Sequence, residues 1–101
     1  MGKFGYRCPE AGIKELDEKK FADYLQEVEC WGNSELEVIP AKIGDCKGLE
    51  KLLAYSCSLK AIPVQLVAAK DTLTVLNLSS NKITAIPSEL GALSALTEID
   101  L

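Results

Sequence analysis

The chain has 101 residues, which is enough for one domain, and 48% of them are hydrophobic, so a core can form. The formal net charge of −4 argues against nucleic acid or an anionic membrane surface as a partner, because both attract basic surfaces. The chain has no histidine, which excludes imidazole acid–base chemistry and the usual histidine-activated nucleophiles.

The N-terminus shows no targeting or membrane-spanning pattern. It lacks the apolar core of a secretory signal, and no apolar run reaches the roughly 18–20 residues that span a bilayer. We therefore expect a cytoplasmic protein. Gly2 and Cys8 leave lipidation open as an alternative, although Tyr6 stands where the myristoylation pattern has Ser or Thr.

Residues 10–24 carry apolar side chains at roughly helical spacing, at Ile13, Leu16, Phe21 and Tyr24. This spacing predicts a helix over about 13–24. Because the first unit of a repeat array exposes an apolar end, we interpret residues 1–24 as an N-terminal tail and a cap helix. An amphipathic helix that binds a partner is the alternative.

A pattern of about 24 residues recurs from residue 25 onward. The clearest copy, from Leu73 to Pro87, reads L-x-x-L-x-L-x-x-N-x-I-x-x-I-P. The same frame starts at Leu49 and at Leu25, with one residue inserted before Leu36 in the earlier copy. A last, partial copy begins at Leu96. These starts divide the chain into units 25–48, 49–72, 73–95 and 96–101.

This pattern is the leucine-rich repeat, and it resembles the repeats of small intracellular scaffold and Ras-pathway proteins. The Leu-x-Leu alternation predicts short strands, and stacking of the units predicts an α/β solenoid shaped as a short curved horseshoe. We expect parallel strands on the concave face and helical or 3-10 turns on the convex face, at about 42–47, 64–71 and 88–94. By resemblance, such modules hold signalling enzymes, GTPases or cytoskeletal components.

One position after each strand is expected to satisfy buried backbone groups where the chain turns. Asn33, Cys57 and Asn81 occupy it, and an inward Asn can donate and accept hydrogen bonds at once. Cys57 and the inward Cys30 are therefore interpreted as structural. The four cysteines include no C-x-x-C pair, so we expect no zinc site. The expected cytoplasmic location disfavours disulfides.

The outward strand residues are the predicted binding site for another protein. Trp and Tyr at exposed positions are typical of interfaces, and the acidic members favour a basic or mixed partner surface. The alternative for Trp31 is packing over the N-terminal cap, and Leu53 could simply pack on Tyr55. The predicted partner-binding residues are Glu27, Glu29, Trp31, Lys51, Leu53, Tyr55, Val75, Asn77, Ser79, Glu98 and Asp100.

Two other classes of function remain open to a chain of this pattern. Glu27 and Glu29 would stand roughly 7 Å apart on one strand face, a spacing seen in inverting glycosidases, but an open sheet offers no deep cleft. We therefore predict no catalytic residue, no cofactor and no metal. Leu101 falls on an inward strand position with no segment after it. The alternative function is thus a structural solenoid fragment, completed at its C-terminal edge by self-association or by a host assembly.

Overall fold

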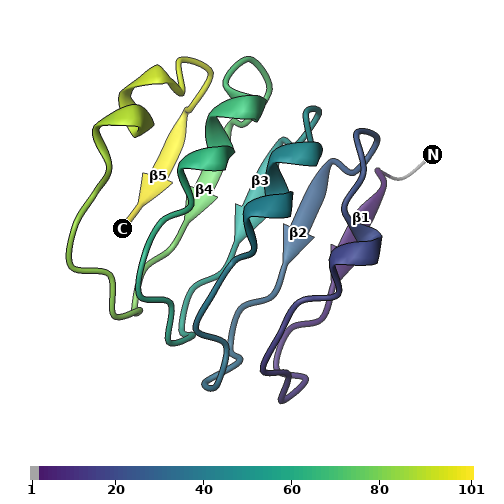
Figure 1. The fold of residues 1–101 in the computed structure, drawn as a ribbon, viewed down its shortest axis with the longest axis vertical. Helices are drawn as coiled ribbons and strands as arrows, with labels where there is room; N and C mark the ends of the chain where they lie inside the picture. Colours follow the sequence, from purple (N-terminus) through teal and green to yellow (C-terminus); the bar gives the residue numbers. More distant parts are fainter. Residues whose placement is uncertain (1–2) are drawn as a thin grey trace.

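The computed structural model describes residues 3–101, so the candidate lipidation residue Gly2 lies outside the described residues. Five short parallel strands form one sheet in chain order (Figure 1). The register places equivalent residues 22, 24, 24 and 23 positions apart along the chain. This arrangement confirms the predicted solenoid. The strands are β1 (Gly5–Arg7), β2 (Glu27–Glu29), β3 (Lys51–Leu53), β4 (Val75–Asn77) and β5 (Glu98–Asp100).

Short 3-10 helices connect the strands and stack beside one another on the opposite side of the solenoid (Figure 1). They are η1 (Glu18–Lys20), η2 (Ala41–Asp45), η3 (Val64–Ala69) and η4 (Ser88–Ala92). A proline is the N-cap of each of the last three, where its fixed φ suits the first turn. These three match the predicted turns. No helix of residues 3–101 is both long and apolar enough to cross a membrane.

The predicted cap helix over 13–24 is wrong. The segment contains only η1, and the chain before it contributes β1 to the sheet. Tyr6 pairs with Val28, and the Tyr6 hydroxyl accepts a hydrogen bond from the backbone N–H of Asp17 at 2.9 Å. Leu16 and Phe21 are buried in the core. An isolated helix of about twelve residues is only marginally stable, whereas this path pairs the β1 backbone and buries the same side chains. We name residues 3–24 the first unit and 25–48, 49–72 and 73–95 the second to fourth units.

The core lies between the sheet and the 3-10 helices. Its central row consists of Val28, Leu52 and Leu76, which neighbour each other in the register and are fully buried. The next residue of this row, Ile99 on β5, is 52% exposed, because β5 has a neighbour on one side only. Apolar side chains thus stack continuously from β2 to β4 and reach the surface at β5.

The turn after each strand is held by the side chain that the sequence singled out. Asn33 is fully buried; its Oδ1 accepts from the amides of Ala11 and Ile13, and its Nδ2 donates to the carbonyls of Cys8 and Cys30. Asn81 acts in the same way toward Ala54, Leu78 and Leu59. The Cys57 thiol makes the weaker substitute bond, a donation to the Cys30 carbonyl at 3.3 Å. The structural interpretation of this position is confirmed.

Each of these turns also needs a residue with positive φ. Glu10, Gly32, Ser56 and Ser80 take φ between 50° and 76°, at spacings that follow the repeat. A left-handed residue reverses the chain direction sharply after the strand. Only the second unit places glycine there, and the other three positions carry the strain of a side chain in this conformation.

Candidate interaction surface

The sheet has one face that carries the predicted binding residues. We call it the open sheet face. It is turned away from the core, and the repeat pattern predicts that it is concave. On β2, β3 and β4 each central residue is buried and both flanking residues are half-buried. The register aligns the outward residues into two rows across the sheet. One row is Glu27, Lys51, Val75 and Glu98, and the other is Glu29, Leu53, Asn77 and Asp100.

An aromatic pair lies two residues beyond the ends of β2 and β3. The rings of Trp31 and Tyr55 are stacked, with centroids 5.3 Å apart and planes 4° from parallel. The Gly32 amide donates to the Tyr55 carbonyl at 2.9 Å, which fixes the two backbones next to each other. Both side chains are half-buried. Trp31 therefore packs on Tyr55 rather than over an N-terminal cap, and the pair forms a flat aromatic platform beside Leu53.

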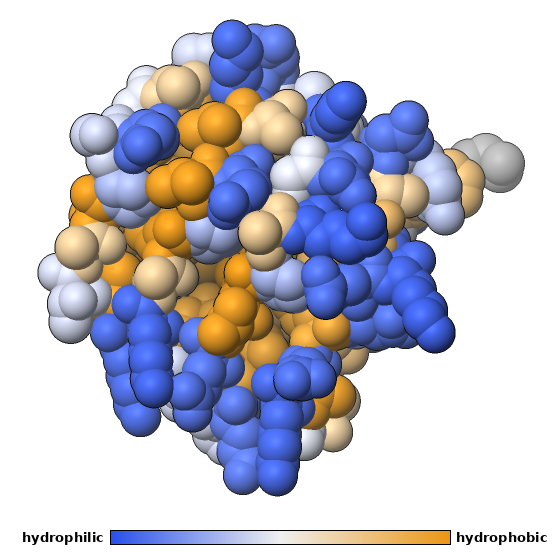
Figure 2. Space-filling view, viewed as in Figure 1, coloured by the Kyte–Doolittle hydropathy of each residue, from blue (hydrophilic) through white to orange (hydrophobic). Residues whose placement is uncertain are grey.

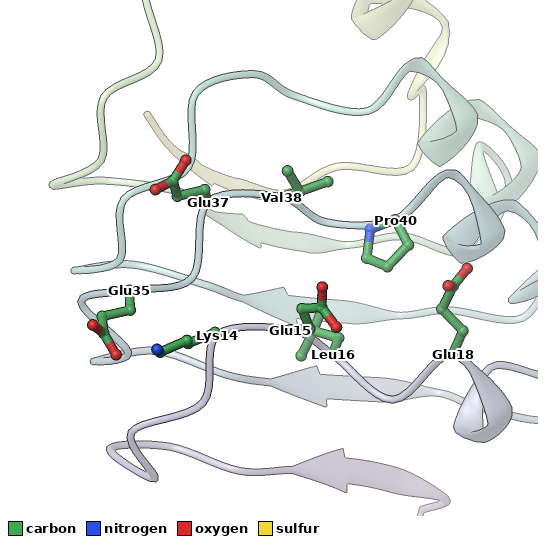
Figure 3. A pocket seen from close by; sticks show the side chains of 8 residues that line it. All are labelled: Lys14, Glu15, Leu16, Glu18, Glu35, Glu37, Val38 and Pro40. Atoms are coloured by element: carbon green, nitrogen blue, oxygen red, sulfur yellow. The ribbon is translucent and has the colours of Figure 1, made fainter.

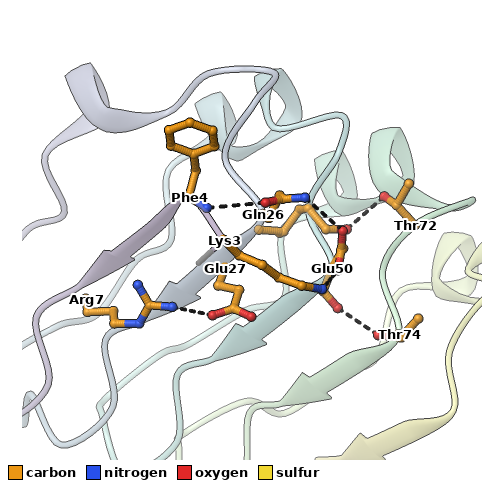
Figure 4. Close-up of polar contacts among 9 residues, drawn as sticks. Lys3, Phe4, Arg7, Gln26, Glu27, Glu50, Thr72 and Thr74 are labelled. Atoms are coloured by element: carbon orange, nitrogen blue, oxygen red, sulfur yellow. Dashed lines mark hydrogen bonds and ion pairs between the residues drawn. The ribbon is translucent and has the colours of Figure 1, made fainter. Parts of the chain in front are cut away.

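The β1 end of the open sheet face is neutralised by ion pairs that the sequence did not predict. The Arg7 guanidinium binds the carboxylate of Glu27 (Figure 4). It also binds the carboxylate of Glu29, at 3.0 Å from Nε. These contacts raise the pKa of Arg7, chiefly through the hydrogen bond to Glu29. The sequence pattern does not reveal Arg7, because it predicts a tail and a cap helix and no strand before residue 25. One cation therefore holds both carboxylates at this end of the sheet.

A second chain of polar contacts links the starts of the first four strands. The Gln26 side chain accepts from the Phe4 amide at 3.2 Å and donates to Glu50 at 3.1 Å (Figure 4). Glu50 also binds the Lys3 ammonium, and this contact raises the pKa of Lys3. The carbonyl of Glu50 accepts from the Thr74 hydroxyl at 3.1 Å. These bonds tie neighbouring units together beside the sheet and hold its strands in register.

The β5 end is acidic and exposed. Glu98 and Asp100 project from β5, and among residues 3–101 no cation pairs with either carboxylate. On β4 the neighbours in the register are Val75 and Asn77, and the Asn77 Oδ1 accepts from the Ser79 hydroxyl at 2.8 Å. The open sheet face thus runs from a neutralised end, across an apolar centre, to an acidic end. Figure 2 shows the other side of the domain, that of the 3-10 helices, where hydrophilic side chains dominate toward the N-terminal units and apolar ones reach the surface at the centre and toward the C-terminal units.

The four thiols are free, and none is set up as a nucleophile or metal ligand. Burial raises the pKa of Cys30 to about 12, and it also raises the pKa of Cys8 and Cys46. A thiol with a raised pKa stays protonated at neutral pH, whereas reactivity needs the thiolate. Within the described part of the chain, no cluster of three His, Cys, Asp or Glu side chains could hold a metal ion.

Comparisons with known proteins support this architecture. A family model described as Leucine Rich Repeat matches residues 72–93. The chain contains a leucine-rich repeat and has the leucine-rich-repeat fold. A solved leucine-rich-repeat protein from Leptospira interrogans superposes with a TM-score of 0.79 at 23% identity, over 88% of this chain and 22% of that one. This leucine-rich-repeat domain thus spans about a fifth of that protein.

A second solved structure is the BIR3–SERK2 complex from Arabidopsis thaliana. It matches with a TM-score of 0.53 at 23% identity, over 93% of this chain and 62% of the matched one. What both structures share with the domain is the fold. No curated protein sequence matches the chain.

Proposed function

We propose that this leucine-rich-repeat domain is a non-catalytic protein-interaction module and that a partner protein binds its open sheet face. The stacked pair Trp31 and Tyr55, half-buried beside Leu53, carries the proposal. Trp and Tyr are the residues most often found at the energetic centre of interfaces, because they bury a large area at low entropic cost. A fold of this kind occurs in the BIR3–SERK2 complex, which agrees with a role in binding proteins.

The charges on the open sheet face indicate the chemistry of the partner. Arg7 already neutralises Glu27 and Glu29, whereas Glu98 and Asp100 have no such cation among residues 3–101. We infer a partner that places an apolar or aromatic side chain over the Tyr55 platform and basic side chains near β5. Because these carboxylates are exposed, they contribute to orientation and association rate more than to affinity.

Affinity capture from native lysate tests this proposal. The bait is the domain with Leu53→Ala and Tyr55→Ala, and the matched control is the domain with Val64→Ala and Tyr24→Ala, an exposed aliphatic and an exposed tyrosine residue outside the outward rows of the sheet. Circular dichroism first establishes that both variants are folded. We expect the control to retain the wild-type partner and the first variant to lose it. Equal recovery by both variants would contradict binding at the open sheet face.

A cytoplasmic location and a scaffold role belong to the same proposal. Cys8, Cys30, Cys46 and Cys57 are free thiols, as is usual in reducing compartments. The location of a fluorescent fusion tests this part, and export of the fusion from the cell would contradict it.

Assembly through the β5 edge is the second candidate function. Ile99 and Leu101 are 52% and 43% exposed there, and a hollow of about 340 Å³ lined by Ile83, Ile86 and Leu101 lies beside them. Exposed strand edges with apolar side chains favour pairing with another chain. Sedimentation velocity distinguishes the candidates: if this edge is the interface, Ile99→Asp abolishes association and Glu98→Lys changes it little. A monomer at all concentrations would contradict self-association.

A further inference from the structure

A groove separates the first and second units on the flank that leads from the turns to the 3-10 helices. Its volume is about 530 Å³, and Figure 3 shows the two chain segments that border it. Glu15 and Pro40 point toward the space between the segments, whereas Glu37 and Val38 point away from the first unit. Leu16 forms a buried apolar floor, and Val38, 63% exposed, stands on the opposite wall. The lining residues are Lys14, Glu15, Leu16 and Glu18 on the first unit, and Glu35, Glu37, Val38 and Pro40 on the second.

Backbone pairing on this flank stops at the groove. The Ser58 amide donates to the Leu36 carbonyl at 2.9 Å, and the Lys82 amide donates to the Leu59 carbonyl at 2.8 Å, so later units are joined there. Among residues 3–101, no backbone hydrogen bond joins 14–18 to 34–40, and the amides of Glu37 and Val38 have no hydrogen-bond acceptor. The break coincides with the residue inserted before Leu36. The second unit therefore offers unpaired amide N–H groups along one wall of the groove.

The groove is acidic on both walls. Glu15 and Glu18 lie on one wall and Glu35 and Glu37 on the other, against the single lysine Lys14 in the lining. Glu37 also pairs with Lys60 at 2.9 Å on the side of the third unit, and this contact lowers the pKa of Glu37. Cations entering the groove would therefore lie between carboxylates from two directions, above an apolar floor.

The unpaired amides of the second unit favour an extended occupant. Each wall of the groove is a stretch of about five residues, or about 16 Å of extended chain, which is the length of a short strand. An extended chain can accept hydrogen bonds from the unpaired amides, whereas the carbonyls of a helix are already bonded within the helix.

We propose that this groove binds an extended, basic segment of a partner protein, with alternate side chains that are apolar and cationic. The apolar side chains lie on Leu16 and Val38, the cationic ones reach Glu15 and Glu35, and the segment's carbonyls accept from the amides of Glu37 and Val38. This site is separate from the open sheet face and stands whether or not that face binds a partner.

Fluorescence anisotropy with a labelled peptide of about eight alternating lysine and valine residues tests the proposal. We expect saturable binding to the wild-type domain and none of the same peptide with glutamate in place of lysine. Glu15→Lys combined with Glu35→Lys should weaken binding at least about tenfold, because each reversal replaces an attraction by a repulsion. The matched control, Asp71→Lys combined with Glu89→Lys, makes the same change in net charge at exposed positions outside the groove. Its affinity for the peptide should stay within about twofold of the wild type.

Amide hydrogen exchange then locates the bound peptide. Protection of the Glu37 and Val38 amides is expected. A peptide N-methylated along its backbone keeps its carbonyl acceptors and should bind as tightly as the unmodified peptide. Tyr55→Ala should leave the affinity unchanged, which separates this site from the open sheet face. The proposal is overturned by absence of saturable binding up to about 1 mM, by equal weakening in the control variant, or by protection at Glu98–Asp100 instead.

Discussion

Replacing Asn33 by alanine should remove the side-chain hydrogen bonds that close the turn between the first and second units. The Asn33 side chain is fully buried and makes its four shortest hydrogen bonds to backbone groups: the amides of Ala11 and Ile13, and the carbonyls of Cys8 and Cys30. The Cys30 carbonyl bond is fully buried, and the other three are part-buried, where water can substitute. A buried group left without a partner costs about 1–3 kcal/mol, and a replaceable bond contributes about 0.5 kcal/mol or more.

The structure therefore predicts that Asn33→Ala lowers the free energy of unfolding by about 3 kcal/mol. This loss is a large part of the free energy of unfolding of a typical domain, which is about 5–15 kcal/mol. It corresponds to a fall in Tm of roughly 12 °C or more. Urea unfolding followed by far-ultraviolet circular dichroism measures the loss, and fluorescence of the single tryptophan, Trp31, provides a second probe.

Asn77→Ala is the matched control. The Asn77 Oδ1 accepts from the amide and the hydroxyl of Ser79, on the half-buried open sheet face where water replaces both bonds. Its unfolding free energy should change by less than about 1 kcal/mol. If Asn33→Ala also stays within about 1 kcal/mol of the wild type, the reasoning that this side chain closes the turn is refuted.

Three further predictions concern single positions. Gly32→Ala should destabilise the domain by about 1–2 kcal/mol, because Gly32 has φ of 76° and an added Cβ would meet the Glu10 side chain at 2.7 Å; Gly91→Ala, with open space around it, should not. Because burial raises the pKa of Cys30, the folded state keeps this thiol protonated at pH values where the unfolded state ionises it. Its contribution to the free energy of unfolding is complete below the ordinary pKa of 9.0 and is lost as pH rises toward about 12. Wild type should therefore lose about 1 kcal/mol more than Cys30→Ala between pH 8 and pH 10 in urea unfolding, and an equal loss would contradict the burial of this thiol. Arg7→Ala should lower Tm at low ionic strength and by a smaller amount in 1 M NaCl, where exposed ion pairs are screened; no dependence on salt would count against the pairs with Glu27 and Glu29.

The second to fourth units could be predicted because their leucine spacing is regular. Val28, Leu52 and Leu76 fall at one position of the repeat, and the structure buries all three in neighbouring strands. The prolines before η2, η3 and η4 likewise placed the 3-10 helices to within a few residues. A period-two strand followed by a fixed turn leaves the backbone little choice of path.

The first unit could not be predicted as easily, because its residues differ from the pattern. Tyr6 stands where later units have an aliphatic residue, Ala11 where they have Asn or Cys, and the spacing to β2 is 22 residues. Ile13 and Leu16 also fit a helical stripe at the same spacing. The signal that distinguishes the two is the match with Leu36-x-x-Ile39, Leu59-x-x-Ile62 and Ile83-x-x-Ile86 in the later units.

The contacts of the candidate surfaces were the least predictable part. Alternation along the strands placed Trp31 and Tyr55 on the same face, but their stacking depends on side-chain rotamers that a repeat pattern does not determine. The Arg7 pairs required β1 to be recognised first. The groove beside Val38 depends on how one inserted residue displaces the chain, which is a property of three-dimensional packing.

Site-specific photo-cross-linking tests the central claim, that a partner protein binds the open sheet face, most directly. A benzophenone side chain is placed at Ser79, next to the Tyr55 platform in the register, and at Val64 on η3 as the control. The two domains are irradiated in native lysate and analysed by mass spectrometry. We predict one protein cross-linked from position 79 and absent from position 64, with the adduct lost on Tyr55→Ala. Adducts from both positions alike, or from position 64 alone, would contradict the claim.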